Sequence, residues 1–166
     1  MTTASAHLQT LKQARLVATR RDGTRIHYRF AGPDIADLYA QLRDVAAGRL
    51  ADVDAARRAY LGPGADVDEV VDRAELLRRA QAGDIVVLDV WPAEEYAAGH
   101  IAGALGIPVD RIADLPDAAE VVAYCRGRFC VFAHDAVRLL TAHGRTARRL
   151  KDGMLEWRLA GVPVAA

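Results

Sequence analysis

The chain has 166 residues, enough for one well-buried domain of about 100 residues and a smaller unit. Its 22 basic and 22 acidic residues cancel, so the net charge predicts neither a nucleic-acid partner nor an acidic one. The sequence contains two cysteines and no apolar run long enough for a secretion signal or a membrane span. We therefore expect a cytoplasmic protein without membrane contact, whose thiols are catalytic or metal-binding rather than paired in structural disulfides.

The first 30 residues carry six basic side chains against one acidic side chain, a local charge of about +5. Residues 3–18 have apolar side chains at helical spacing, which predicts a helix. The runs 16–20 and 25–30 favour strands, and Asp22-Gly23 between them is a strong hairpin signal. The chain is thus expected to begin with a helix and a basic hairpin.

This segment resembles the ArsR family of bacterial regulators, from the recognition helix of their winged helix-turn-helix onward. The resemblance lies in Ser5-Ala6-His7-Leu8, Leu11, Ala14-Arg15-Leu16-Val17, Arg20-Arg21-Asp22-Gly23 and Tyr28. It implies a partial DNA-binding domain over residues 1–32, with a recognition helix for the major groove and a wing whose arginines meet phosphate. The helices that come first in that family have no counterpart after Met1, so either the true start lies upstream or the DNA function is lost. The side chains expected to contact DNA are His7, Lys12, Arg20, Arg21 and Arg25.

Residues 33–61 have apolar side chains at near-heptad spacing, which predicts a long helix that Pro33 starts and Gly48 interrupts. In the resembled family this helix forms the dimer, which implies a homodimer through residues 33–61. An amphipathic helix that packs on its own chain explains the spacing equally well. Residues 62–66 follow as a glycine- and proline-rich linker, and the second domain is expected over 67–166.

Strand and helix patterns alternate from residue 67 onward. Runs apolar on both faces, such as 85–90 and 121–124, are typical of buried parallel strands. The pattern predicts an α/β fold, a three-layer domain with a parallel sheet and ligands beyond the carboxyl ends of its strands. Helices are expected at 68–82, 94–98, 111–115, 131–142 and 154–160, and the remaining strands at 104–107 and 147–150.

A short loop that starts with Cys125 separates the buried strand 121–124 from the helix 131–142. Amides at a helix N-terminus, together with arginines nearby, lower a thiol's pKa and stabilise anions. Cys130 lies five residues after Cys125, where it is either a thiol that attacks modified Cys125 or a small buried hydrophobe. Two cysteines are too few ligands for zinc, and His134 and His143 are expected on the surface.

Four motifs in this order are similar to a single-domain rhodanese, a sulfurtransferase. They are Leu88-Asp89-Val90, Gly99-His100-Ile101, Tyr124-Cys125-Arg126-Gly127 and Asp152-Gly153 with Trp157. The resemblance implies a rhodanese-like domain whose catalytic nucleophile is Cys125, with no cofactor. It implies Asp89, His100, Gly153 and Trp157 as supporting residues. The substrate-binding residues expected in the loop are Arg126, Gly127, Arg128, Phe129 and Cys130.

The expected reaction moves sulfane sulfur from a small donor such as thiosulfate onto Cys125, and from the persulfide to a thiol or to cyanide. Many rhodaneses place an arginine where this chain has Trp91-Pro92, so the ion pair of that arginine is not expected here. A second hypothesis is a DNA-binding regulator whose thiols sense reactive sulfur or oxidants. A third is an arsenate reductase or phosphatase, which the lack of an arginine at the end of the loop disfavours.

Overall fold

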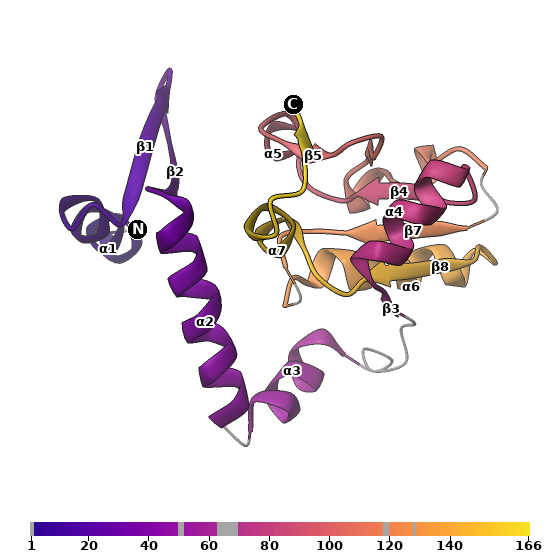
Figure 1. The fold of residues 1–166 in the computed structure, drawn as a ribbon, viewed down its shortest axis with the longest axis horizontal. Coiled ribbons are helices and arrows are strands. Elements are labelled where there is room, and N and C mark those ends of the chain that lie inside the picture. Colours follow the sequence, from indigo (N-terminus) through magenta and orange to yellow (C-terminus); the bar gives the residue numbers. More distant parts are fainter. Residues whose placement is uncertain (1, 50–51, 63–69, 118–119, 128) are drawn as a thin grey trace. The chain divides into compact units, whose positions relative to one another are not determined.

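The computed structural model describes residues 2–49, 52–62, 70–117, 120–127 and 129–166 (Figure 1). The chain divides into two compact units, residues 1–50 and 51–166. Most of the expected linker, from residue 63 onward, lies outside the described residues, and so does the expected start of the second domain at residue 67.

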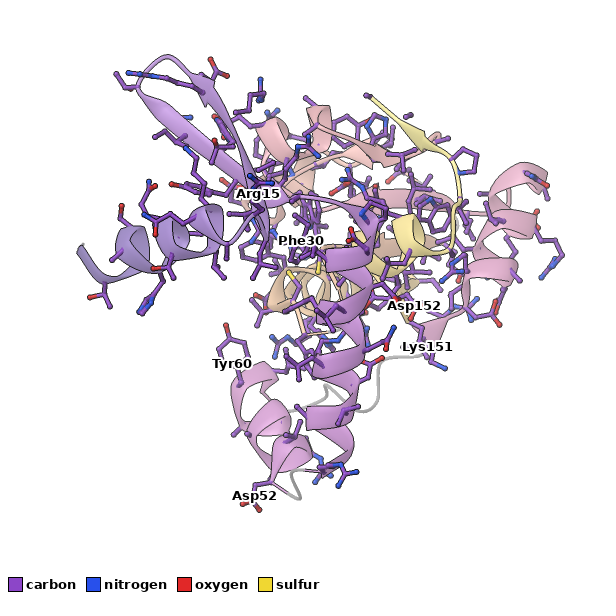
Figure 2. The ribbon with its side chains drawn as sticks, turned by 60° about the vertical axis from the view of Figure 1, so that its left-hand side comes forward. Arg15, Phe30, Asp52, Tyr60, Lys151 and Asp152 are labelled. Carbon is purple, nitrogen blue, oxygen red and sulfur yellow. The ribbon has the colours of Figure 1, made fainter. Side chains whose placement is uncertain are left out.

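The first unit contains the predicted helix and hairpin, and the hairpin is confirmed. Its strands pair antiparallel, with Gly23 in the turn at a φ of 56°. The helix was predicted to reach residue 18 but ends earlier, because Arg15 takes a φ of 58° and the next residues join the hairpin. Arg15 precedes the first strand of the hairpin, and Phe30 is the last residue of its second strand (Figure 2). The elements are α1 (Thr2–Gln13), β1 (Val17–Asp22), β2 (Arg25–Phe30) and α2 (Pro33–Arg49).

The segment expected as one long helix contains two helices. The first is α2, and the second is α3 (Val53–Leu61), which belongs to the second unit. The end of α3 is anchored there, because Leu61 is buried and its carbonyl oxygen accepts a hydrogen bond from Arg138 Nη1 at 3.0 Å. The apolar side chains of α2 at Leu38, Leu42 and Val45 are exposed within this chain.

The second unit is built on a five-stranded sheet in the order β3-β8-β7-β4-β6, whose neighbouring pairs are all parallel. In Figure 1, α4 covers the near face of this sheet and α6 the far face, which gives the expected three layers. Its strands are β3 (Val70–Val71), β4 (Val86–Asp89), β6 (Leu105–Gly106), β7 (Val121–Tyr124) and β8 (Ala147–Leu150). The other elements are α4 (Arg73–Ala82), α5 (Ala93–Ala97), the 3₁₀ helix η1 (Val109–Asp114), α6 (Val131–Ala142), α7 (Met154–Leu159) and the antiparallel pair β5 (His100–Ile101) and β9 (Val164–Ala165).

The expected elements of this unit agree with the structure within two residues at each end, with one exception. The helix expected at 68–82 begins at Arg73, because the two residues of β3 add to the sheet beside β8. Asp72 then caps the helix by accepting a hydrogen bond from the Glu75 amide at 2.8 Å. Of the four two-residue strands in the described residues, β6 was predicted, and β3, β5 and β9 were not, since runs this short carry no periodic signal.

His134 was predicted on the surface, and this prediction is wrong. Only 1% of its side chain is exposed, because it lies on the face of α6 that also buries Val137 and Leu140. His143, at the end of the same helix, is exposed as expected. None of the described helices is long and apolar enough to cross a bilayer.

A half-buried ion cluster ties α4 to the edge where β7 begins. Arg79 donates two hydrogen bonds to Glu120, at 3.0 Å and 2.7 Å, and Arg148 of β8 donates a third at 2.6 Å. These donors lower the pKa of Glu120 below its ordinary value of 4.5. The cluster therefore adds stability in full above about pH 4.5, and loses it as the pH falls through the lowered pKa.

We predict that Glu120→Gln lowers the free energy of unfolding by about 1–3 kcal/mol near neutral pH. The difference from the wild type should shrink at acid pH, as the pH falls through the lowered pKa of Glu120 and the wild-type carboxylate takes up its proton. Urea unfolding at neutral and at acid pH measures this. The control Asp114→Asn breaks an exposed ion pair with Arg111 and should change stability by less than about 0.5 kcal/mol. A pH-independent loss in Glu120→Gln would contradict the assignment.

Candidate active site

Cys125 directly follows β7, the strand between β4 and β8 in the sheet. All four residues of β7 are buried, and Cys125 is itself only 2% exposed. The loop after it runs to the N-terminus of α6, as the sequence predicted. The thiol thus lies at the carboxyl edge of the sheet, where ligands of such folds bind.

The two thiols face each other within a ring of backbone amides. Cys125 and Cys130 are hydrogen-bonded through their side chains, and neither is in a disulfide. Cys125 Sγ also lies 3.8 Å from the Gly127 carbonyl oxygen and 3.7 Å from that of Cys130. Two amides face each sulfur, one from the loop and one from the first turn of α6. They belong to Gly127 and Ala133 for Cys125, and to Arg126 and Phe132 for Cys130.

The negative charge of this pair rests on Cys130. The thiol of Cys125, the amides and the charge of Arg126 lower the pKa of Cys130 to about 6. Hydrogen bonding to Cys130 and burial raise the pKa of Cys125. The sequence had predicted the lowered pKa at Cys125, but the neighbouring thiolate and the burial decide otherwise. The pair thus loses one proton readily and its second with difficulty.

Arg126 is held at the rim of the site rather than free. Its Nε donates to Glu95 Oε2 at 2.9 Å and its Nη2 to the other oxygen of the same carboxylate. Its guanidinium lies 5.7 Å from the centre of the Trp91 ring, a cation–π distance. Glu95 raises the pKa of Arg126, which therefore stays charged. The other loop arginine, Arg128, lies outside the described residues.

Asp89 is fully buried at the end of β4, opposite Tyr124. The resemblance implied a supporting role for Asp89, and its carboxylate accepts hydrogen bonds from two neighbouring groups. The Tyr124 hydroxyl donates to Asp89 Oδ2 at 2.6 Å, and the Trp91 amide donates to Oδ1 at 3.0 Å. Burial raises the pKa of this carboxyl. The hydroxyl in turn accepts from the Ile101 amide at 2.9 Å, which links three segments of the site.

Gly153 and α7 support the loop from outside. A Cβ on Gly153 would lie 2.3 Å from the Gly127 nitrogen, so only glycine fits. The amides of Met154 and Leu155 donate to the carbonyl oxygens of Cys125 at 3.0 Å and Arg126 at 3.2 Å. With these carbonyls bound outside, the loop amides are free to face the sulfurs. Asp152 (Figure 2) accepts a hydrogen bond from Arg73 Nη2 at 3.3 Å.

Trp157 and His100 lie in packed, hydrogen-bonded positions. Trp157 is 1% exposed and its Nε1 donates to the Pro163 carbonyl oxygen at 3.1 Å. The His100 ring stacks on Tyr96 with 3.8 Å between ring centres, and its Nδ1 lies 3.0 Å from the Tyr96 carbonyl oxygen. Among the described residues, no group of three metal-ligating side chains comes together.

Sequence reasoning missed the role of Glu95 and the two supporting amides of α7. Glu95 has no local signal, because its partner Arg126 is 31 positions away. The amides of Met154 and Leu155 are invisible to any residue-type pattern, since every non-proline residue has one.

The residues expected to contact DNA lie in the first unit, on α1 and on the hairpin. The hydrogen bond from Gln9 Nε2 to the Tyr28 hydroxyl, at 3.1 Å, fixes α1 against β2. Arg21 Nε donates to the Gly23 carbonyl oxygen at 3.0 Å, and Arg20 lies 3.9 Å from Asp22 in an exposed ion pair. All five candidates, His7, Lys12, Arg20, Arg21 and Arg25, are exposed.

Comparisons with known proteins bear on each unit. The family model of the rhodanese-like domain matches residues 72–160. The whole chain is similar to HTH-type transcriptional regulator Rv0324 of Mycobacterium tuberculosis, with 54% identity over 99% of this chain and 73% of the relative. A sulfurtransferase of Allochromatium vinosum is 28% identical over 60% of this chain and 96% of that protein.

A solved structure also matches the fold. It is the BH2092 protein of Bacillus halodurans, 27% identical with a TM-score of 0.55, which covers 68% of this chain and 85% of that one. Together these matches agree with the α/β fold and parallel sheet described above.

Gly153→Ala tests the packing of the loop on α7. The added methyl group would displace the backbone at Gly127, so we expect a loss of about 1–3 kcal/mol in unfolding free energy and a changed alkylation rate of Cys125. The control is Gly48→Ala in α2, where a Cβ meets open space and a gain of up to about 1 kcal/mol is expected. Equal stability of the two variants would show that the close packing is absent.

The charge on Cys130 predicts a pH profile for thiol alkylation. The rate with iodoacetamide, mapped to each cysteine by peptide mass, should rise at Cys130 with a midpoint at about pH 6. In Cys125→Ala the midpoint should move up towards the ordinary thiol range, because the largest cause of the lowered pKa is removed. A midpoint that stays unchanged in this variant would refute the thiol–thiolate pair.

Proposed function

This chain belongs to the rhodanese-like domain family, and we propose from this that it is a sulfurtransferase that forms a persulfide on Cys125. Sulfur transfer is supported at the level of the family. The observation that carries the finer proposal is the position of Cys125, a buried thiol at the carboxyl edge of the sheet with two backbone amides directed at its sulfur. Two free thiols suit a reducing cytoplasm, the location we propose.

The first step of the proposed reaction forms the persulfide. Cys125 passes its proton to the Cys130 thiolate along their hydrogen bond and attacks the outer sulfur of a donor such as thiosulfate. The sulfur–sulfur bond of thiosulfate breaks, and sulfite leaves with the bonding electrons. The new terminal sulfur is an anion, which the amides of the site stabilise.

The second step passes this sulfur on. A thiolate or cyanide attacks the terminal sulfur, and Cys125 leaves as a thiolate that regains the shared proton. We propose the loop from Arg126 to Cys130 as the substrate-binding segment, with Gly127, Arg128 and Phe129 between them. Since Glu95 already binds Arg126, an anionic donor meets this arginine in competition with a carboxylate. No cofactor enters the scheme.

We predict that Cys125→Ser lowers thiocyanate formation from thiosulfate and cyanide at least about 1,000-fold, because the nucleophile is lost. The mass of the variant should also gain no sulfur from the donor. A control is His143→Ala, an exposed position at the end of α6 that should keep wild-type rates. Sulfur transfer that persists in Cys125→Ser would refute the proposal.

A second candidate function is transcriptional regulation, with DNA bound by the first unit. The observation in its favour is the match to a regulator over nearly the whole chain, with 54% identity. The exposed basic side chains of α1 and the hairpin suit phosphate contacts of a partial ArsR-type winged helix-turn-helix. The exposed apolar side chains of α2 support the proposed homodimer through residues 33–61. Persulfide formation on Cys125 would then be the signal that changes DNA affinity.

A mobility-shift assay with the DNA upstream of the gene for this chain tests the regulator proposal. We expect salt-sensitive binding that differs between reduced and persulfidated protein. Replacement of Arg20, Arg21 and Arg25 by glutamine should reduce the slope of log affinity against log salt by about 1 for each arginine that meets phosphate. The control Arg111→Gln removes an exposed arginine of the second unit and should leave the slope unchanged. Absence of salt-sensitive binding would exclude this function.

A further inference from the structure

The site contains a second thiol, Cys130, that takes a proton but carries no sulfur in the transfer to an external acceptor. Cys130 is half-buried at the N-terminus of α6 and its side chain is hydrogen-bonded to that of Cys125. The loop is folded so that the two thiols meet, because the Cys130 amide donates to the Gly127 carbonyl oxygen at 3.0 Å and its carbonyl oxygen lies 3.7 Å from Cys125 Sγ. A persulfide on Cys125 therefore forms beside a second nucleophile, Cys130.

We propose that Cys130 is a second catalytic thiol, which attacks the sulfur of persulfidated Cys125, closes a Cys125–Cys130 disulfide and releases hydrosulfide. This inference rests on the proposed function, because it begins from the persulfide on Cys125. It adds a further activity, the reduction of sulfane sulfur to sulfide.

The step balances in atoms and electrons. The Cys130 sulfur forms a bond to Cys125 Sγ, and the bond between Cys125 Sγ and the terminal sulfur breaks. The terminal sulfur leaves with the bonding electrons and with the proton that Cys130 held, as hydrosulfide. Sulfane sulfur is reduced by two electrons, and the two cysteine thiols are oxidised to one disulfide.

Three features of the site favour this internal attack. As the proton of Cys130 moves to the terminal sulfur, two amides and the charge of Arg126 stabilise the thiolate that attacks. Cys125 is buried, so an external thiol must enter the site while Cys130 is already in contact. The leaving terminal sulfur lies among amides that stabilise an anion.

The difference in exposure also predicts how the site is restored. In the disulfide, Cys130 is the more accessible sulfur, since it is half-buried and Cys125 is 2% exposed. A small thiol therefore attacks Cys130, forms a mixed disulfide with it and frees Cys125. A second thiol then attacks the first one in this mixed disulfide and frees Cys130. Repeated sulfide release requires a thiol reductant, in the ratio of two thiols for each sulfur.

A single-turnover experiment without oxygen, cyanide or added thiol tests the proposal. Reduced full-length protein is mixed with thiosulfate, then hydrosulfide is measured and the intact protein is weighed by mass spectrometry. The wild type should release about one hydrosulfide per chain and lose the mass of two hydrogens, with Cys125 and Cys130 joined in the peptide map. Cys130→Ser should form the persulfide more slowly, because it lacks the thiolate that takes the proton of Cys125, and should then keep the added sulfur and release no hydrosulfide.

The outcomes separate the two proposals. A wild type that keeps the added sulfur and releases no hydrosulfide overturns the role of Cys130 and leaves the sulfurtransferase proposal standing. A wild type that neither gains sulfur nor releases hydrosulfide overturns the sulfurtransferase proposal itself. The rate of hydrosulfide release must be independent of protein concentration, since a rate that rises with concentration would mean attack between chains and overturn the internal step. The wild-type measurements decide alone if Cys130→Ser does not fold.

Discussion

The hydrogen bond between the Tyr124 hydroxyl and the buried carboxylate of Asp89 is the interaction on which the site depends. The two residues end neighbouring parallel strands and are paired in register, so the bond joins β4 and β7 at their carboxyl ends. Cys125 follows Tyr124 directly, and its position is set by this pair. A buried carboxylate that lost its partner would destabilise the fold by several kcal/mol, on the order of 3–5. The same carboxylate accepts a hydrogen bond from the Trp91 amide, so it also holds in place the segment that contacts Arg126 at the rim of the site.

The amides directed at the sulfurs follow from how the loop is packed. The backbone amides and carbonyl oxygens of a buried loop both need hydrogen-bond partners. The first amides of α7 bind the carbonyl oxygens of Cys125 and Arg126. Gly153 permits this contact because it has no side chain in the way. The amides of the loop and of α6 are left facing inward, where an anionic sulfur satisfies them. Chemistry at Cys125 thus depends on residues that never touch a substrate.

The pairing of the two thiols gives the site a charge without a metal ligand or a general base of another type. The pair carries one negative charge, on Cys130, and Arg126 lies close enough to stabilise it. Glu95 keeps Arg126 charged and in place but also offsets its attraction for anions. The balance between these groups sets how strongly the site favours an anionic donor over a neutral one.

Much of this protein was determined by local sequence patterns. The hairpin, the alternation of strands and helices, and a cysteine at the end of a buried strand were predictable, because turn chemistry and periodicity act over a few residues. Tertiary structure alone decided the burial of His134, the bond from Arg126 to Glu95 and the short strand β3. It also moved the low pKa from Cys125 to Cys130. These features depend on groups that meet only when distant segments pack, and no local pattern encodes the distance between two side chains in space.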